Sequence, residues 1–133
     1  MEAITGKVQY RVIYADTDQM GVVYFGNYGK FYEIGRTEMI REMGFSYKEM
    51  EKSGVMMPVY TVESKYRNVI TYDELITIET TVKELPTAKI KFHYRIFNED
   101  GTLAHVATAV LVFMDMKSKK LVRAPEMLLE LFK

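Results

Sequence analysis

Alternating apolar and polar residues predict strands at the start of the chain and throughout its second half. In residues 7–14 every second side chain is apolar or aromatic (Val8, Tyr10, Val12 and Tyr14), and this period of two indicates a half-buried strand. The same pattern, or a continuous apolar run, predicts four more strands, in residues 57–66, 75–83, 89–96 and 103–114. The Asn-Glu-Asp-Gly sequence at 98–101 predicts a hairpin, because its Asp-Gly pair suits the positive φ of such turns.

One segment has a helical period instead. From residue 24 to residue 43 the apolar side chains recur at steps of three and four, which predicts a helix of roughly five turns. Gly44 provides a stop after it. Gly35, inside the helix, should cost about 1 kcal/mol relative to Ala, so we expect it to permit the close approach of another backbone. Ser46 and Glu49 have the spacing of a capping box and predict a short second helix.

Together these elements predict an α+β fold, an antiparallel curled sheet of about five strands wrapped around one long helix. Residues 1–133 are expected to form a single domain, because no segment has the composition of a linker. A short helix is expected after Pro125. The sheet would have open edges, which dimerisation could cover.

Composition removes several classes of function. The 18 basic and 18 acidic residues cancel, whereas a nucleic-acid-binding protein usually carries a net basic charge. No apolar run approaches the roughly 18–20 residues that cross a bilayer, and the first ten residues lack the apolar segment of a secretory signal. There is no cysteine, which excludes disulfides, thiolate metal sites and a cysteine nucleophile. These features predict a cytoplasmic protein without a membrane span.

The residues best suited to chemistry lie between the first strand and the long helix. Asp16 and Asp18 precede the helix, and the free N–H groups of its first turn, near Tyr24 and Phe25, could polarise a thioester carbonyl. Asp18 could attack that carbonyl or activate a water molecule. The ordinary alternative is that these aspartates only cap the helix or form turns.

The same segment resembles a known family. The pattern Y-x-D-T-D-x-x-G-V-V-Y, followed by N-Y and then F-Y-E-x-x-R-T-E-M, is similar to the signature of 4-hydroxybenzoyl-CoA thioesterase and YbgC-type acyl-CoA thioesterases. The resemblance extends from about residue 8 to residue 122. It implies a hotdog fold and the hydrolysis of an acyl-CoA to a free acid and CoA, without a metal or redox cofactor.

Carried over residue by residue, the resemblance assigns roles within this segment. Asp18 matches the catalytic carboxylate, and Asp16 matches the first, structural acid. The backbone N–H of Phe25 matches the group that polarises the thioester carbonyl, and Gly21 lets the loop turn onto the helix. Many YbgC-type members have His where this chain has Phe25; a backbone donor survives that change, whereas a side-chain role for the His would not.

Other candidates are less specific. Lys89 and Lys91, with Arg95, form a basic stripe that could meet the phosphates of CoA or could be an ordinary solvated strand face. Glu33 and Glu38, on the helix, are alternative carboxylates, although Glu33 is better placed to pair with Arg36 at i+3.

The two histidines are not expected to have a catalytic or metal-binding role. His93 should be exposed and His105 should be a hydrogen-bonded strand histidine. No third ligand stands at a suggestive spacing, so no metal site is expected. There is also no glycine-rich nucleotide-binding loop, so no cofactor is expected.

The family also implies a homodimer or homotetramer in which the start of the helix lies beside the other subunit. The amides of Tyr24 and Phe25 would then lie near the other subunit's strand 57–62 or its loop 67–72, which begins at Arg67, a candidate substrate-binding residue. Met56 and Met57 have flexible side chains that could line an acyl pocket. Two rival functions are a dehydratase acting on acyl-carrier protein, disfavoured because no histidine precedes residue 93, and a non-catalytic acyl-thioester-binding scaffold. The scaffold would partner acyl-carrier protein or phospholipid-synthesis enzymes.

Overall fold

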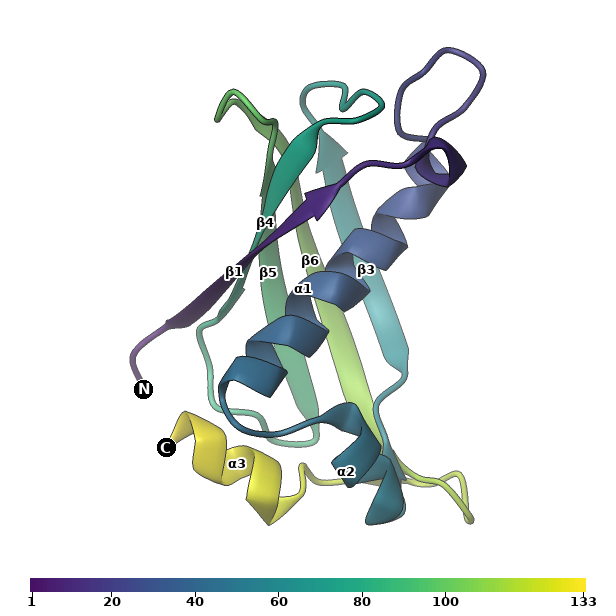
Figure 1. Ribbon diagram of the computed structural model, residues 1–133. Helices are drawn as coiled ribbons and strands as arrows, with labels where there is room; N and C mark the ends of the chain where they lie inside the picture. Colours follow the sequence, from purple (N-terminus) through teal and green to yellow (C-terminus); the bar gives the residue numbers. More distant parts are fainter.

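The computed structural model describes Met1–Lys133 and has the predicted architecture (Figure 1). A curled antiparallel sheet wraps around one long helix, α1 (Tyr28–Glu42), which is the hotdog fold. The strands are β1 (Ile4–Arg11), β2 (Val55–Met56), β3 (Val59–Tyr66), β4 (Leu75–Val82), β5 (Lys89–Phe97), β6 (Leu103–Asp115) and β7 (Leu121–Val122). The other α-helices are α2 (Tyr47–Lys52) and α3 (Glu126–Phe132). The five long strands match the prediction, and β2 and β7 are additional two-residue strands.

The sheet runs in the order β1-β4-β5-β6, with β3 and β2 both pairing along the far side of β6. All of these pairs are antiparallel. The edges are therefore β1 on one side and β3, with β2, on the other. The long strand β6 is central, as its apolar residues on both faces had predicted.

The core lies between α1 and the inner face of the sheet. Alternate side chains of β5 (Ile90, Phe92, Tyr94 and Ile96) are buried, while Lys89, Lys91 and Arg95 between them are exposed. On the opposite side of this core, α1 buries Phe31, Tyr32, Met39 and Ile40, among others. Its other face remains polar, so the helix covers one side of the sheet and no more. No helix is long and apolar enough to cross a membrane.

Gly35 brings α1 close to β4, but the contact differs from the prediction. A Cβ added at Gly35 would lie 2.4 Å from Oγ1 of Thr80 and 2.9 Å from Cγ2 of Ile78. The helix therefore packs against side chains of β4, not against another backbone. Two side chains standing up from the sheet fill the space that a residue larger than glycine would need.

Several predicted boundaries shift for local reasons. The first strand ends at Arg11, and Tyr14 is 76% exposed instead of continuing the buried face. The α-helix begins at Tyr28, because residues 25–27 form a tighter 3-10 turn. The strand predicted in residues 57–66 is interrupted at Pro58, which has no N–H for the ladder.

The predicted helix ends and hairpin are found. Gly44 has φ +95° directly after the end of α1, and the hydroxyl of Ser46 accepts a hydrogen bond from the Glu49 N–H at the start of α2. In the hairpin between β5 and β6, the N–H of Gly101 donates to the carbonyl of Asn98 at 2.9 Å. Only Gly101 of the Asp-Gly pair has a positive φ, +89°.

Candidate active site

The side chain of Asp16 ties the loop after β1 to the first turns of α1. It is 1% exposed and accepts hydrogen bonds from the Tyr10 hydroxyl at 2.8 Å and from the Ile13 N–H at 3.0 Å. Lys30, from α1, forms an ion pair with the same carboxylate and also donates to the Tyr10 hydroxyl. Burial by itself would raise the pKa of Asp16, but Lys30 and the other two donors hold it below its ordinary value.

The backbone carbonyl of Asp16 is equally occupied. It accepts the Tyr24 N–H at 3.0 Å and the side-chain amide of Asn27 at 2.8 Å. These two bonds fix the 3-10 turn Phe25–Asn27 against the loop. Asp16 therefore has a structural place, in line with the family resemblance, and its side chain is not free to meet a substrate.

Asp18 lies in a small hairpin in the same loop. Its N–H donates to the Val22 carbonyl at 2.9 Å, and Thr17 bridges Val23. Gly21 makes the turn with φ +78°, a conformation that glycine adopts readily. One carboxylate oxygen of Asp18, Oδ1, accepts the Met20 N–H at 2.9 Å. The side chain is exposed, and its second oxygen has no hydrogen-bond partner within the chain.

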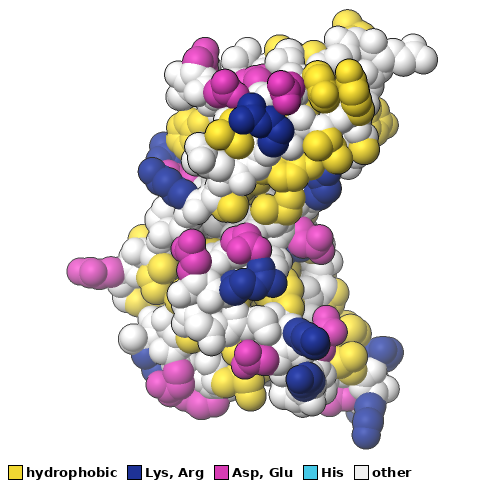
Figure 2. Space-filling model, viewed as in Figure 1, with side chains coloured by type: hydrophobic (Ala, Val, Ile, Leu, Met, Phe, Trp, Pro, Cys, Tyr) yellow, Lys and Arg dark blue, Asp and Glu magenta, His cyan; other side chains and the backbone are white.

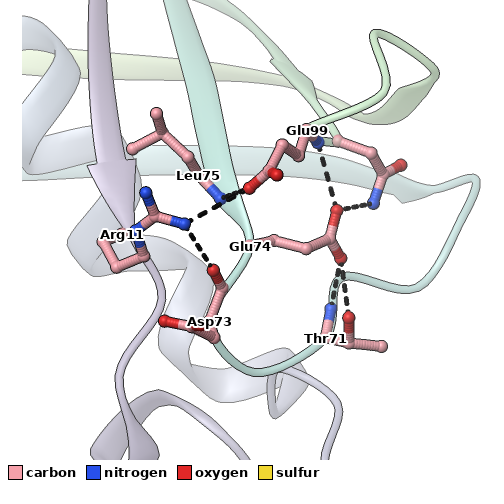
Figure 3. A network of polar contacts seen from close by, with 7 residues as sticks. Arg11, Thr71, Asp73, Glu74, Leu75 and Glu99 are labelled. Atoms are coloured by element: carbon pink, nitrogen blue, oxygen red, sulfur yellow. Dashed lines mark hydrogen bonds and ion pairs between the residues drawn. The ribbon is translucent and has the colours of Figure 1, made fainter.

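A second loop supports this hairpin from the side. Val22 bridges Thr71, and the N–H of Val23 donates to the Ile70 carbonyl at 2.8 Å. The Glu74 carboxylate accepts the Thr71 N–H at 2.6 Å and the Glu99 N–H at 3.1 Å (Figure 3). The loop before β4 is therefore held to the β5–β6 turn.

The neighbouring bonds in Figure 3 extend this support to β1. Glu99 accepts the Leu75 N–H at 2.7 Å, and Arg11 donates to the Asp73 carbonyl at 2.8 Å. Burial would raise the pKa of Glu74, but its hydrogen bonds, those from Thr71 first, leave it lowered. Glu74 is therefore an ionised acceptor at neutral pH, and the loop facing Asp18 is fixed at several points.

Of the backbone N–H groups of residues 24–26, just before α1, one is already hydrogen-bonded and two are free. The Tyr24 N–H donates to Asp16 and is not available to a bound carbonyl, which corrects the expectation that it could serve beside Phe25. The N–H groups of Phe25 and Gly26 have no acceptor in the chain. A Cβ at Gly26 would lie 2.6 Å from the ring of Tyr24, so a larger residue there would require that ring to move. The free amides stand at the start of a helix, where a partial negative charge is stabilised.

A cavity of about 320 Å³ adjoins these amides. Phe25, Tyr28, Tyr66, Arg67 and Val69 contribute to its wall. The Tyr28 and Tyr66 rings meet edge to face, and the Tyr66 hydroxyl lies 3.4 Å from the Phe25 carbonyl oxygen. Arg67 therefore lies beside Phe25 within one chain, whereas the prediction had it reach that place from the other subunit, and Asp18 is not part of this wall.

The other three predicted substrate-binding residues, Met57, Lys89 and Lys91, lie far from Phe25 of the same chain, at the opposite end of the sheet. Lys89 pairs with Val112 of β6 and Lys91 with Val110, whereas Tyr66, beside Phe25, pairs with His105. Five residues of an extended strand, from 105 to 110, span roughly 16 Å. Met57 lies just before β3, at the end of that strand remote from Tyr66. One subunit alone therefore does not bring Met57, Lys89 or Lys91 together with the Phe25 amide.

The predicted pairing of Glu33 with Arg36 is not formed. Glu33 is exposed, and the ion pairs of the protein do not include Arg36. Arg36 is buried, and one terminal nitrogen makes a long hydrogen bond of 3.5 Å to the Tyr94 hydroxyl. The i+3 spacing was compatible with a pair, but Arg36 faces the sheet while Glu33 faces solvent.

Sequence reasoning did not find Lys30 or the role of Tyr10, whereas His105 is the hydrogen-bonded strand histidine that it predicted. Lys30 is the one charged residue between Tyr24 and Tyr32, which is the only signal that the sequence offers. His105 is fully buried, and its Nε2 meets the Tyr32 hydroxyl, which also contacts the Ser64 hydroxyl at 2.7 Å. Burial lowers the pKa of His105 to about 4, so this histidine is neutral at pH 7.

His93 lies on the opposite face of the sheet from His105, and it is partly exposed. Burial, with Lys83 and Lys91 nearby, lowers its pKa. His93 pairs with Thr108 of β6. It lies on the face of β5 that carries the lysines, as the alternation of that strand predicted. The two histidines are therefore not neighbours in one site.

The environment of Asp16 predicts how stability depends on pH. Replacing Asp16 by Asn should lower the free energy of unfolding by roughly 1–3 kcal/mol at neutral pH, because a buried acceptor of three donors is lost. The native pKa lies below the ordinary value of 3.8, so the wild-type advantage is present above that value and disappears as the pH falls through the lower native pKa. Urea unfolding of both proteins between pH 7 and pH 2 measures this. An advantage that stays constant down to the lowest pH would contradict the ion-pair account.

Comparison with known proteins places this architecture in a family. Residues 12–132 match the model of the thioesterase-like superfamily. The chain is 38% identical over 114 residues to the putative acyl-CoA thioesterase YneP of Bacillus subtilis, covering 86% of this chain and 83% of that protein. It is 32% identical to the acyl-CoA thioester hydrolase YbgC of Escherichia coli O6:H1, covering 92% of each.

A solved structure agrees in both fold and sequence. The DHNA-CoA thioesterase from Staphylococcus aureus superposes with a TM-score of 0.87 at 34% identity, covering 90% of this chain and 80% of that one. The family match spans the loop with Asp16 and Asp18, the long helix and every strand after it. The chain therefore belongs to the thioesterase-like superfamily of hotdog-fold proteins.

Proposed function

We propose that the protein hydrolyses the thioester of an acyl-CoA to a free acid and CoA. The observation that carries this is the unpaired N–H of Phe25, held at the start of α1 in the same loop system as the exposed carboxylate of Asp18. Relatives across nearly the whole chain are named acyl-CoA thioesterases or thioester hydrolases. Our assignment extends that activity to this chain and gives roles to particular groups.

In the proposed reaction, the thioester carbonyl oxygen accepts a hydrogen bond from the Phe25 N–H. This donor and the helix behind it stabilise the negative charge that develops on that oxygen. Asp18 either attacks the carbonyl carbon or takes a proton from the water that attacks it. In the first route the carbon–sulfur bond breaks as a mixed anhydride with Asp18 forms, and water then hydrolyses that anhydride to the free acid and regenerates the carboxylate. In the second route water adds to the carbonyl carbon directly and the carbon–sulfur bond breaks. In both routes the CoA sulfur takes up a proton.

Local geometry suits Asp18 to this role better than Asp16. Asp16 is committed on both of its carboxylate oxygens, whereas Asp18 uses only Oδ1, in a turn with Met20. The non-catalytic scaffold would require neither an exposed, unpaired carboxylate oxygen nor a free amide. The names of the relatives also favour hydrolysis.

Replacing Asp18 by Asn should reduce kcat by at least about 10²-fold, the usual size of an acid–base contribution. The fold should persist, because the Asn side-chain oxygen can still accept the Met20 N–H. Thiol release from a panel of aliphatic and aromatic acyl-CoAs measures turnover, and circular dichroism checks the fold.

The matched control is Glu33→Gln, which makes the same chemical change at the alternative, helix-borne carboxylate. It should leave kcat within a few-fold of the wild type. If Glu33→Gln is the inactive variant and Asp18→Asn retains more than about a third of kcat, the assignment of the two acids is wrong.

We also propose that the active unit is a dimer formed along β3. This edge strand has a free row of backbone groups and large apolar side chains that the chain leaves uncovered, with exposures of 72% for Tyr60, 46% for Val62 and 52% for Tyr66. Tyr66 and Val62 are on the inner face with Ser64. The helix α1 reaches this strand through Tyr32–Ser64 and Tyr28–Tyr66 contacts, but it leaves much of the Val62 and Tyr66 side chains exposed. Figure 2 shows hydrophobic side chains gathering at the end of the molecule that carries the 17–25 loop.

Twofold pairing of β3 would complete the site. Two β3 strands related by a twofold axis run antiparallel, so the start of one lies beside the end of the other. Met57 of the second subunit would then approach the Tyr66 and Phe25 end of the first. In such a dimer the second subunit would cover part of the site, which would explain why the Asp18 carboxylate is exposed in a single chain.

Light scattering should give at least twice the chain mass of 15.5 kDa at micromolar concentration. Val62→Lys, which places a charge on the inner face of β3, should produce monomers and reduce hydrolysis, since charged residues block edge pairing. The control is Gln9→Lys, on the exposed face of the opposite edge strand β1. A monomeric Val62→Lys protein with full activity would exclude a shared site.

Lys89 and Lys91 remain proposed contacts for the CoA phosphates, supplied by the second subunit. Replacing both by Gln should raise KM with little change in kcat, because binding is weakened equally in the ground state and the transition state. Added salt should reduce the difference, because exposed charges are screened. The control replaces Lys117 and Lys120, in the β6–β7 turn, by Gln. An unchanged KM at low salt would make the stripe an ordinary solvated face.

A further inference from the structure

The cavity of about 320 Å³ beside Phe25 has one polar lining residue that has no role in the proposed reaction so far, Asn68. Asn68 lies in the loop between β3 and β4, and it is exposed. Its backbone N–H donates to the Ala104 carbonyl at 3.0 Å, which ties the residue to β6. The Asn68 side chain therefore extends from an anchored backbone at the wall of the cavity that adjoins the free Phe25 amide.

The buried residue Asn98 determines how the Asn68 side chain is oriented. The amide nitrogen of Asn98 lies 2.9 Å from the Val69 carbonyl oxygen and 3.0 Å from Oε1 of Glu74. Glu74 is ionised and a backbone carbonyl has no proton, so both groups can only accept hydrogen bonds. The nitrogen of Asn98 must therefore face these two acceptors, which leaves its oxygen Oδ1 to face Asn68.

This oxygen in turn selects which end of Asn68 it meets. Two amide oxygens cannot form a hydrogen bond with each other, so Asn68 must present its nitrogen to Asn98, and the two atoms lie 2.9 Å apart. The oxygen Oδ1 of Asn68 is on the other branch of the same planar amide. No group of the chain donates a hydrogen bond to that oxygen. The protein therefore holds a hydrogen-bond acceptor in one orientation and does not use it.

Two unused polar groups of opposite kind thus adjoin one cavity. The Phe25 N–H can donate a hydrogen bond and Oδ1 of Asn68 can accept one, while Tyr28 and Tyr66 contribute apolar wall between polar groups. A matching ligand has a carbonyl, an N–H and a short hydrocarbon link between them. An acyl-CoA has this sequence of groups, because its thioester carbonyl is followed by the sulfur, two methylene groups and the N–H of the first pantetheine amide.

We infer that Oδ1 of Asn68 accepts the N–H of the pantetheine amide nearest the sulfur while the thioester carbonyl lies on the Phe25 N–H. The inference rests on the proposed function and deepens it, because it makes Asn68 a residue that recognises the thiol part of the substrate independently of the acyl group. Arg67, on the same wall, cannot take this part, since a guanidinium has donors and no acceptor.

Two small thioesters with the same acyl group test this contact. One is the thioester of N-acetylcysteamine, which keeps the amide N–H, and the other is the thioester of 2-mercaptoethyl acetate, which has an ester oxygen in its place. The wild-type protein should hydrolyse the first with a kcat/KM roughly 5–10-fold higher, the effect of about one hydrogen bond. Uncatalysed hydrolysis of both compounds corrects for any difference in their own reactivity.

Asn68→Ala should remove this preference and should lower kcat/KM for acyl-CoA by a similar factor. The matched control is Arg67→Met, which changes a neighbouring residue of the same wall and leaves Asn68 in place. This control should keep the preference for the N–H compound even if its activity falls. If Asn68→Ala does not fold, the ratio measured for the wild-type protein decides, and if the small thioesters react too slowly to compare, the effect of Asn68→Ala on acyl-CoA decides.

Equal kcat/KM for the two small thioesters in the wild-type protein would overturn the inference, because Asn68 would then meet only water. A preference that survives in Asn68→Ala, or an unchanged kcat/KM of that variant for acyl-CoA, would also overturn it. Each of these results is compatible with hydrolysis of acyl-CoA that depends on Asp18, so failure of the inference is distinguishable from failure of the proposed function. If acyl-CoA is not hydrolysed at all, both fail.

Discussion

The ion pair between Asp16 and Lys30 is the interaction on which the functional end of the molecule depends. It joins three parts of the chain, because Tyr10 of β1 and the Ile13 N–H share the same carboxylate. The carbonyl of the same residue holds the turn that leads into α1. One buried residue therefore determines where the sheet, the loop and the helix start meet. The exposed Asp18 can be mobile in its side chain while its backbone is placed accurately.

The two aspartates of the motif, Asp16 and Asp18, have different surroundings. Asp16 and Asp18 are two residues apart, yet one is enclosed by donors and the other faces solvent with an unpaired oxygen. The second loop, fixed through Glu74, prevents the Asp18 hairpin from folding away from the helix. A buried, ion-paired carboxylate and an exposed one with an unpaired oxygen can thus be neighbours in sequence, because the contacts of Asp16 fix the backbone from which Asp18 extends.

Much of the fold followed from periodicity. The alternation in β5 and the three-and-four spacing in α1 reflect which side of each element is buried, and both survive in the structure. The break before β3 comes from Pro58 itself, whereas the error at the start of the helix comes from a contact outside the helix. The helix starts at Tyr28 because the Asp16 carbonyl captures the Tyr24 N–H, which no local pattern reveals.

The sequence motif indicated which loop forms the candidate site, but it did not show which groups in that loop are already hydrogen-bonded. The motif singled out Asp18 and the amides of Tyr24 and Phe25 as candidates, but no sequence pattern shows that the Tyr24 amide already donates to the Asp16 carbonyl. The spacing of Glu33 and Arg36 suggested a pair, whereas burial of Arg36 against Tyr94 separates them. The burial of Arg36 depends on how α1 is rotated about its axis against the sheet. That rotation is set by all of the side chains that pack in the core together.

The close packing at Gly35 has a consequence for how the family can diverge. Gly35 lies seven residues after Tyr28, about 10 Å along the helix axis at 1.5 Å per residue. Since the start of α1 is tied to β1 through Lys30, a larger residue at Gly35 could be accommodated only by tilting the helix about that tie. The tilt would change the direction of the Phe25 amide. Under the proposed function, a substitution at this helix position, far along the chain from Asp18, would alter the rate of hydrolysis while the fold itself persisted.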